Sequence, residues 1–232
     1  MTITLLIAGG VGARIGQDIP KQFMDVLGKP VIAYTMERFQ SCSLIDGIVI
    51  VTLKDWIGKV WEFAERYGIS KLRDVVAGGA TGHESIHNGI VAIAKSFPPD
   101  TAVMIHDAVR PMVNDAIIAD NLAVYHEKGN ATTVTACAEV LFQSDLPMEL
   151  NRHIDRSTVW RTQTPQTFRL DNLLRAHKEA VVRDLPSPLA TCHLFSMLGE
   201  KVYFSKGGER NLKLTTTDDV AIFKAMLSMD AN

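Results

Sequence analysis

Short apolar stretches of strand length alternate along this chain with longer stretches in which apolar residues recur at helical spacing. The strand-like stretches lie at 3–8, 47–52, 74–77, 102–106, 132–137 and 201–205. The helix-like stretches lie at 31–40, 56–67, 84–96, 114–128, 170–182 and 217–229. Buried strands that alternate with amphipathic helices predict an α/β fold, in which helices cover both faces of a mostly parallel sheet. A chain of 232 residues is an ordinary length for one such domain, so we expect 1–232 to fold as a single unit.

The segment from about 138 to 167 interrupts this alternation. It contains Pro147 and Pro165, several charged residues and little periodicity. Roughly thirty irregular residues inside a compact domain are unusual and are often functional. We expect this segment to leave the sheet and to form an arm or a contact with another subunit.

The net charge and the cysteines limit the classes of function. A formal net charge of −2 gives no overall electrostatic case for binding nucleic acid or an anionic membrane, although a local cationic pocket is compatible with it. No charged region precedes the first apolar run, and this run is too short for a signal peptide or a membrane span. Cys42, Cys137 and Cys192 show no metal-ligand spacing, so we expect reduced thiols in the cytoplasm.

The first expected strand runs directly into a glycine-rich loop. Gly9, Gly10 and Gly12 follow the strand, and two cations, Arg14 and Lys21, come shortly after them. Glycines let backbone N–H groups approach a ligand closely, and a nest of such groups binds anions. Because Arg and Lys add full positive charge, this pattern predicts a phosphate-rich ligand at the end of the first strand.

Three other interpretations of this loop differ in the residues that they require. A Rossmann dinucleotide loop needs G-x-G-x-x-G and an acid about 20 residues later, whereas here the third glycine is displaced to Gly16 and no strand-end acid follows. A Walker loop is excluded because Gly-Lys-Ser/Thr does not occur. The simplest alternative is a tight strand–helix turn with a solvated Arg14.

A second group of polar residues follows the expected strand at 102–106. A carboxylate such as Asp107, at a strand end beside a phosphate loop, suits Mg²⁺, and Arg110 could hold a second phosphate bidentately. The alternative is an N-cap aspartate that forms a surface pair with Arg110. We expect His106 to pack or to form hydrogen bonds rather than to catalyse.

Two further segments are less specific. The glycine-rich stretch at 78–85 leaves another expected strand, and amides near Gly79 or the Ser85 hydroxyl could contact a base or a ribose. A plain loop with a capping residue explains the same pattern. Lys213 lies between two apolar residues near a strand-like run, and a single lysine is usually solvated.

Together, five motifs resemble those of the cytidylyltransferase family that includes methylerythritol 4-phosphate and ribitol 5-phosphate cytidylyltransferases. They occur in the family's order and span nearly the whole chain. The motifs are AGGVGAR at 8–14, PKQ at 20–22, DAVRP at 107–111, TPQ at 164–166 and NLKLT at 211–215.

The resemblance implies a Rossmann-like nucleotidyltransferase domain, in a homodimer whose protruding β-arm, at about 138–167, reaches into the partner. The implied reaction joins CTP and an alditol phosphate, giving a CDP-alditol and pyrophosphate. A substrate phosphate oxygen attacks the α-phosphorus in line without a covalent enzyme intermediate, so positioning and charge stabilisation do the catalytic work. Mg²⁺ would bridge the triphosphate oxygens, and neither nucleic acid nor a membrane is an expected partner.

The resemblance also implies roles for individual residues. Three cations would stabilise charge around the α-phosphate: Arg14, Lys21 and Lys213. Seven residues would hold cytidine and the phosphates: Ala8, Gly9, Gly10, Val11, Gly12, Gly79 and Ser85. Five would face the alditol phosphate: Asp107, Arg110, Thr164, Thr191 and Arg156. Of these, Arg156 lies on the arm and would come from the partner subunit. Asp107 is also the expected Mg²⁺ ligand.

The chain departs from the family pattern mainly around the alditol. Gly82 replaces an Arg that often precedes the serine of the second glycine loop, Cys192 replaces an Asp after Thr191, and 140–141 are Val-Leu instead of Asp-Thr. Gly9 and the DAVR and ESI sequences at 107–110 and 84–86 resemble the ribitol 5-phosphate branch more closely. That branch implies cell-surface polymer synthesis, whereas the methylerythritol alternative implies isoprenoid precursors.

Two other classes were kept as alternatives. Because the departures cluster at substrate positions, a nucleotide-binding regulator without turnover is one alternative. A nicotinamide oxidoreductase, which would bind NAD(P) and not CTP, is the other.

Overall fold

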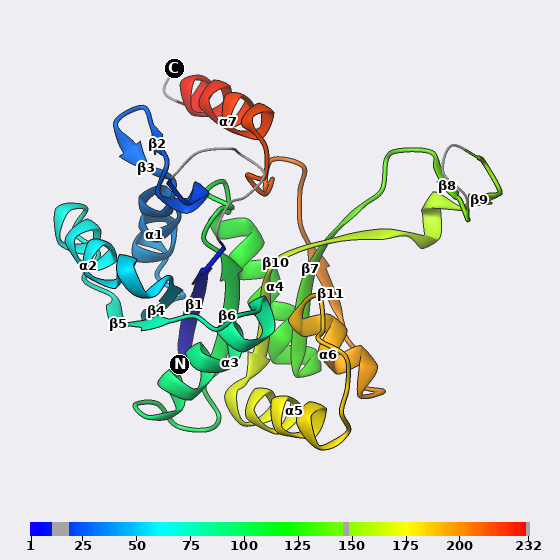
Figure 1. The fold of residues 1–232 in the computed structure, drawn as a ribbon, viewed down its shortest axis with the longest axis horizontal. Helices are drawn as coiled ribbons and strands as arrows, with labels where there is room; N and C mark the ends of the chain where they lie inside the picture. The colour runs from blue at the N-terminus through cyan, green and yellow to red at the C-terminus, as the bar shows by residue number, and fades with distance from the viewer. Residues whose placement is uncertain (11–18, 146–148, 231–232) are drawn as a thin grey trace.

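One mixed sheet organises the computed structural model, which describes residues 1–10, 19–145 and 149–230. In the described chain this sheet has seven strands in the order β11-β7-β10-β6-β1-β4-β5 (Figure 1). The strands are β1 (Thr2–Ala8), β4 (Gly47–Thr52), β5 (Leu72–Ala77), β6 (Ala102–Asp107), β7 (Asn130–Ala136), β10 (Trp160–Arg169) and β11 (Phe204–Lys206). Only β10 runs against its neighbours, β6 and β7, so the predicted mostly parallel sheet is confirmed.

Helices cover both faces of the sheet, as predicted. One face carries α1 (Val31–Ser41), α2 (Ile57–Arg66) and α4 (Asp115–Lys128), which pack on Leu6 and its neighbours. The other carries α3 (Gly82–Ala94), α5 (Leu170–Val182) and α6 (Thr191–Met197), which pack on Leu5. Successive strand residues point to opposite faces, which explains why β1 is apolar throughout. No helix within the described ranges is long and apolar enough to cross a bilayer.

Helix α3 packs closely against the sheet at one glycine, Gly89. A Cβ added at Gly89 would come within 2.4 Å of a Leu5 methyl carbon and 2.7 Å of a Val51 methyl carbon. Such distances are shorter than packed side chains tolerate, so a larger residue would push the helix outward. The glycine therefore keeps the N-terminal end of α3 beside the ends of β1 and β4.

A third apolar cluster holds the C-terminal part of the chain against the body. It joins the short hairpin of β2 (Asp25–Val26) and β3 (Lys29–Pro30) to α7 (Thr217–Asp230). The 3-10 turns η1 (Lys21–Phe23) and η2 (Lys54–Trp56) belong to the first cluster, where the Phe23 and Trp56 rings stack with centroids 4.0 Å apart. Leu214 and Phe223 are almost completely buried in the third cluster. Burial of two such side chains contributes about 3–6 kcal/mol and fixes the segment just after Lys213.

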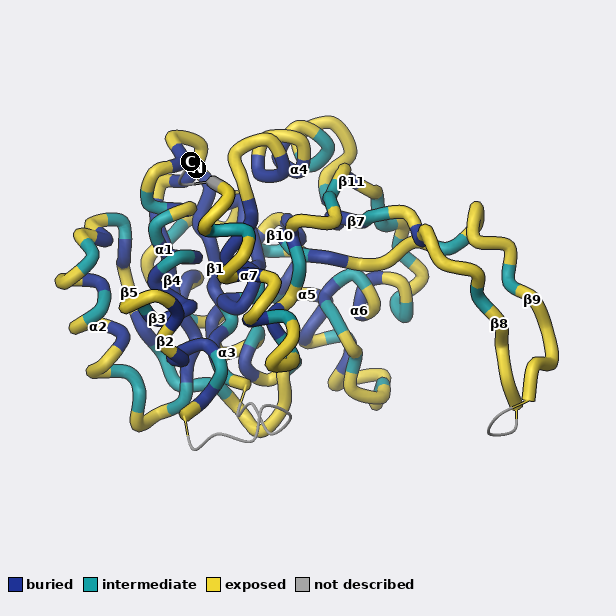
Figure 2. Tube along the Cα trace, turned by 90° about the horizontal axis from the view of Figure 1, so that it is seen from above, coloured by how far each residue is buried: buried dark blue, intermediate teal, exposed yellow. Residues whose placement is uncertain are grey.

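A two-stranded arm projects from the body (Figures 1 and 2). Its strands are β8 (Leu141–Gln143) and β9 (Arg152–Ile154), followed by the 3-10 turn η3 (Arg156–Thr158). The arm expected at 138–167 is therefore shorter at its C-terminal end, because 160–167 belong to β10 in the central sheet. Backbone pairing with β6 and β7 places these residues in the sheet, although polar side chains hide the strand pattern.

Candidate active site

The register of the parallel strands brings four strand ends to one edge of the sheet. Ile7 pairs with Asp107 of β6, and Thr52 of β4 pairs with both Ala8 and Ala77. A cavity of about 850 Å³ opens at this edge. Ligands of open α/β sheets bind at such a position, outside the carboxyl ends of the strands.

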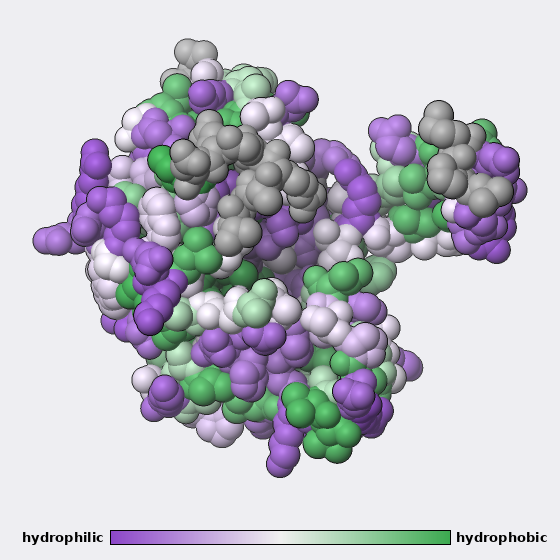
Figure 3. Space-filling model, viewed as in Figure 1, coloured by the Kyte–Doolittle hydropathy of each residue, from purple (hydrophilic) through white to green (hydrophobic). Residues whose placement is uncertain are grey.

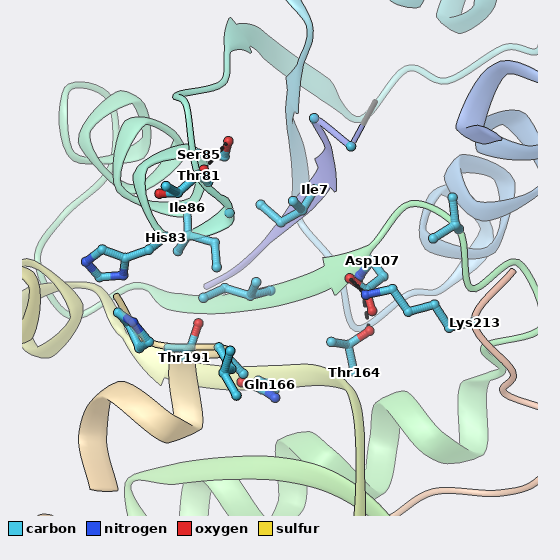
Figure 4. A pocket seen from close by; sticks show the side chains of 18 of the residues that line it. Ile7, Thr81, His83, Ser85, Ile86, Asp107, Thr164, Gln166, Thr191 and Lys213 are labelled. Carbon is cyan, nitrogen blue, oxygen red and sulfur yellow. Dashed lines mark hydrogen bonds and ion pairs between the residues drawn. The ribbon is translucent and has the colours of Figure 1, made fainter. Parts of the chain in front are cut away.

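Most of the predicted site residues line this cavity (Figure 4). They come from seven separate segments: Gly9, Gly10, Lys21, Gly79, Ser85, Asp107, Arg110, Thr164, Thr191 and Lys213. Val11, Gly12 and Arg14 lie outside the described residues. Ala8 is buried behind the cavity, and Arg156 is exposed on the arm and does not line the cavity of its own chain.

The Gln22 side chain holds the first glycine loop in place. Its Nε2 donates to the carbonyl oxygens of Ala8, at 2.6 Å, and Gly10, at 3.0 Å. Gln22 is 1% exposed and its hydrogen bond to Ala8 is buried, so this bond forms away from water. The neighbouring Lys21 runs beside Gly10, because a Cβ added there would meet Lys21 Cε at 4.0 Å. Gln22 belongs to the PKQ motif at 20–22, but the motif alone predicts no role for this side chain.

Ser85 joins the second glycine loop to the first. Its hydroxyl accepts from the Gly79 N–H at 3.1 Å and donates to the Thr81 carbonyl at 2.9 Å. A Cβ added at Gly9 would lie 3.3 Å from the same hydroxyl oxygen. Thr81 caps α3 by accepting from the Glu84 N–H, so the first-turn amides of α3 border the cavity. Such amides favour negatively charged groups.

Asp107 lies between two cations. Its carboxylate accepts from Arg110 Nε at 3.0 Å and from Lys213 Nζ at 3.1 Å. Figure 4 shows the Lys213 side chain reaching Asp107. Burial opposes ionisation of this carboxyl, but Lys213 and Arg110 outweigh it and lower its pKa to about 2. Asp107 does not cap a helix, since Asn114 caps α4, and the Arg110 side chain is only 10% exposed. The alternative of a capping aspartate in a surface pair is therefore wrong.

A hydrogen-bonded chain fixes the backbone of this cluster. His106 is fully buried, and burial lowers its pKa to about 4, so the ring is neutral at neutral pH. Its Nε2 donates to the Arg110 carbonyl at 3.2 Å, so its Nδ1 accepts from the Thr164 hydroxyl at 3.0 Å. The same hydroxyl oxygen accepts from the Asp107 N–H at 3.1 Å. The expectation that His106 forms hydrogen bonds is confirmed.

The opposite wall of the cavity is formed by Thr191 at the start of α6. Gln166 of β10 ties this helix to the sheet, since its Oε1 accepts from the Cys192 N–H at 3.0 Å and its Nε2 donates to Cys192 Sγ at 3.5 Å. Burial raises the pKa of the Cys192 thiol, so it is protonated at neutral pH. Cys192 therefore packs beside Thr191 as a neutral side chain.

Three histidines from α3 and α5 stack at the edge of the cavity. The rings of His83 and His177 are parallel, with centroids 4.2 Å apart. The His87 ring is tilted, and its centroid lies 5.2 Å from that of His177. Burial, together with the other two histidines, lowers the pKa of His177 to about 3. Protonation of this group in the folded state is therefore unfavourable.

Acidification is expected to destabilise the protein through His177. His177 binds a proton near pH 6.5 in the unfolded chain but only near pH 3 in the folded chain. Its contribution to the free energy of unfolding is therefore fully present above pH 6.5 and decreases below it. By about pH 4 the loss from this group is about 3 kcal/mol. Urea unfolding at about pH 7 and about pH 4 measures the fall in the free energy of unfolding. This fall should be smaller in His177→Phe than in the wild-type protein. An equal loss in both proteins would contradict this assignment.

The described residues offer a metal ion few ligands. Asp107 is the single acid among those cavity residues that the structure describes, and both its oxygens are in ion pairs. Within the described part of the chain, no group of three or more His, Cys, Asp or Glu residues is arranged to hold a metal. Mg²⁺ often keeps several waters and binds through one or two carboxylates together with substrate phosphates. The cavity thus fits a Mg²⁺ ion carried by phosphate groups.

The cavity combines two glycine loops with an excess of cationic side chains, and it is large enough for two phosphorylated ligands. These properties suit the transfer of a nucleotidyl group from one phosphate to another, the chemistry of nucleotidyltransferases. Comparison with known proteins identifies the family. Residues 2–229 match the family model described as 2-C-methyl-D-erythritol 4-phosphate cytidylyltransferase, and the chain belongs to this family.

Two named relatives span the whole chain. A ribitol-5-phosphate cytidylyltransferase from Lacticaseibacillus paracasei is 37% identical over 98% of this chain and 98% of its own. A 2-C-methyl-D-erythritol 4-phosphate cytidylyltransferase from Clostridium acetobutylicum is 32% identical over 100% of this chain and 99% of its own. The chain is thus similar to enzymes that act on two different alditol phosphates.

The fold is shared with solved structures. The structure of 4-diphosphocytidyl-2C-methyl-D-erythritol synthase from Anaerococcus prevotii superposes with a TM-score of 0.82, covering 98% of this chain and 96% of that one. Sequence identity is 24%, so this likeness establishes the fold alone. It agrees with the nucleotidyltransferase fold that the motifs imply.

Proposed function

We propose that the protein transfers the cytidylyl group of CTP to D-ribitol 5-phosphate, giving CDP-ribitol and pyrophosphate. The observation that carries this proposal is the pairing of Arg110 and Lys213 around Asp107, in the same cavity as the glycine loop and Lys21. The glycine loop suits the triphosphate, and the Arg110 region suits the phosphate of the acceptor. The alternative substrate is 2-C-methyl-D-erythritol 4-phosphate.

In this reaction the acceptor phosphate attacks the α-phosphorus of CTP, and pyrophosphate leaves. Lys21 and Lys213, with Arg14 by family resemblance, would stabilise the charge that develops there. Gln22 and Ser85 would keep the two glycine loops in their binding shape. No side chain needs to form a covalent intermediate, so the rate depends on positioning and electrostatics.

We further propose that Mg²⁺ enters with the triphosphate. Among the described residues of the cavity, Asp107 is the one carboxylate that could contact it, and this would require Lys213 or Arg110 to move from the carboxylate oxygens. The ion would neutralise charge on the phosphate oxygens. Location in the cytoplasm stays a prediction, with which the three free thiols agree.

The preference for ribitol 5-phosphate is supported by the relatives that carry that name. Five such relatives are 33–37% identical over 98–100% of this chain, and three methylerythritol relatives are 32–34% identical over 96–100% of it. The neutral Cys192 beside Thr191 also distinguishes this acceptor wall from the Thr-Asp pair of the family pattern.

Pyrophosphate release with CTP and each acceptor, measured side by side, tests the substrate. We expect kcat/KM for ribitol 5-phosphate to exceed that for methylerythritol 4-phosphate by at least about tenfold, a difference of about 1.4 kcal/mol in transition-state binding. The reverse order would select the alternative substrate. CTP binding without turnover would indicate a regulator, and binding of NAD(P) but not CTP would indicate an oxidoreductase.

We propose that the arm inserts into a second copy of the chain. Three of its apolar side chains are exposed, Val140 at 64%, Phe142 at 47% and Leu150 at 75%. Figure 3 shows hydrophobic surface on the arm among hydrophilic side chains. Exposed apolar groups on a projecting ribbon favour burial against a partner. At the base of η3, Arg156 donates to the Ala138 carbonyl at 2.7 Å and is otherwise solvent-exposed, so it can reach a neighbouring cavity.

Arg156→Ala is expected to raise the KM for the acceptor by about tenfold and to leave the KM for CTP nearly unchanged, because one phosphate contact is lost. Steady-state kinetics with each substrate varied in turn measures this split. In a mixture with Lys213→Ala, about a quarter of all sites should regain both residues if the arm crosses between subunits. If the activity of the mixture does not exceed the summed activities of the two variants measured alone, the arm does not cross between subunits.

A further inference from the structure

We propose that Asn211 is a positioning residue that holds Lys213 and Arg110 in their catalytic places. The proposal rests on the proposed cytidylyltransferase function and deepens it. Asn211 is fully buried and does not line the cavity, so it acts through its neighbours.

The Asn211 side chain joins the loop at 207–214 to β10. Its Nδ2 donates to the Thr164 carbonyl at 2.8 Å and to Gln163 Oε1 at 3.2 Å. Both acceptors are oxygens, so only a side chain with two N–H donors satisfies them. These hydrogen bonds lie in the part of β10 where its register against β7 shifts, between Thr162 and Gln166.

The Asn211 backbone joins the same loop to the cation pair. Its carbonyl accepts from Arg110 Nη1 at 2.8 Å, while Arg110 Nε contacts Asp107. The two bonds use different guanidinium nitrogens and so fix the plane of Arg110, which a single bond would leave free to turn. Movement of Asn211 would therefore disturb Arg110 directly.

Gln163 supports the loop from the other side. It donates to the Gly208 carbonyl at 2.9 Å and accepts from the Gly208 N–H at 3.3 Å. A Cβ added at Gly207 would lie 2.4 Å from Gln163 Oε1, so glycine at this position allows the close approach. The Asn211 N–H also donates to the Gly208 carbonyl, at 3.1 Å, which closes the loop.

Lys213 follows this anchored turn and precedes a second anchor. The Leu214 N–H donates to the Val109 carbonyl at 2.9 Å, and the Leu214 side chain is 1% exposed. Because the backbone is held at Asn211 and Leu214, the Cα atom of Lys213 has a fixed position, and the exposed side chain extends from there to Asp107. A fixed backbone lowers the conformational entropy that is lost when the ammonium group of Lys213 binds a phosphate.

The test is a double-mutant cycle of Asn211→Ala and Lys213→Ala, with pyrophosphate release as the rate. In the wild-type background, Asn211→Ala is expected to lower kcat by at least about tenfold and to change the KM for CTP by less than about threefold. In the Lys213→Ala background the same change is expected to lower kcat by less than about threefold, since Lys213 is gone and Arg110, which faces the acceptor phosphate, acts mainly on the KM for the acceptor.

Asn130→Ala is the matched control. Asn130 also bridges two backbone groups, donating to the Lys201 carbonyl at 3.0 Å and accepting from the Tyr203 N–H at 3.1 Å, but at the other end of β7. It should lower stability without lowering kcat. Asn211→Ser, which keeps one donor, should stay folded and have an intermediate kcat.

Hydrogen exchange of the peptide that covers 207–214 gives a readout independent of turnover. Exchange is expected to accelerate in Asn211→Ala and not in Asn130→Ala, because only the first loses the anchor of this loop. Unchanged exchange, or equal effects of Asn211→Ala in both backgrounds, would overturn the positioning role. Absence of turnover in the wild-type protein would overturn the proposed function alone, and the exchange result would still decide the role of Asn211.

Discussion

Lys213→Ala is expected to lower kcat by about 100- to 1,000-fold, since a preorganised donor at developing charge is typically worth about 3–4 kcal/mol. Its effect on CTP affinity should be below about threefold, because most of the charge that it stabilises appears only in the transition state. In the structure, Lys213 Nζ contacts Asp107 at 3.1 Å, and 42% of the side chain is exposed. It can therefore turn toward a phosphate without leaving a buried site.

Single-turnover rates and CTP titration, measured on the same preparations, separate these two effects. Lys178→Ala is the control, since Lys178 is exposed on α5 and does not line the cavity. A rate near that of wild type in Lys213→Ala would remove Lys213 from the catalytic residues. A loss confined to CTP binding would make it a ground-state contact only.

Asp107→Asn is expected to lower kcat/KM for the acceptor by about 100-fold, because both cations lose the anion that orients them. The amide keeps the shape of the side chain but cannot neutralise Arg110, whose side chain is 10% exposed. An unpaired cation at such a position costs about 1–3 kcal/mol, so the free energy of unfolding should fall by a similar amount.

The control for this change is Asp171→Asn. Asp171 pairs with Arg169 on the surface, where both side chains are more than one third exposed and a pair contributes at most about 1 kcal/mol. We expect it to change neither turnover nor unfolding measurably. Wild-type kcat/KM in Asp107→Asn would show that Arg110 and Lys213 hold their positions without the carboxylate.

The parts of the fold that sequence predicts best are those in which local pattern and burial agree. The strand at 47–52 coincides with β4, all six residues of which are buried. The helix at 170–182 coincides with α5, since Leu173 and Ala176 recur at helical spacing on its buried face. In such elements the side-chain period alone determines which face meets the core.

The elements that sequence misses depend on distant contacts. Strand β10 reads TQTPQT at 162–167, a polar sequence with an internal proline, and its place in the sheet comes from pairing with β6 and β7. The predicted strand at 201–205 is β11 (Phe204–Lys206), which forms only where β7 offers hydrogen bonds. Tertiary pairing outweighs local propensity in both.

The candidate site shows the same division. Cations and glycines such as Lys21 and Gly79 were predicted from motifs, because phosphate binding needs these residue types near strand ends. The buried amides that hold them, Gln22, Gln163 and Asn211, were not given roles. Their partners lie up to 48 residues away, and an isolated Gln or Asn carries no sequence signal for such a contact.

The account depends on a nucleoside triphosphate lying in the cavity at the carboxyl edge of the sheet. A crystal structure of the protein with CTP and Mg²⁺ tests this most directly. We expect the triphosphate between the Gly9–Gly10 loop and Lys21, with the α-phosphate facing Lys213. Triphosphate bound at another surface, or a cavity left empty at saturating CTP, would contradict the account.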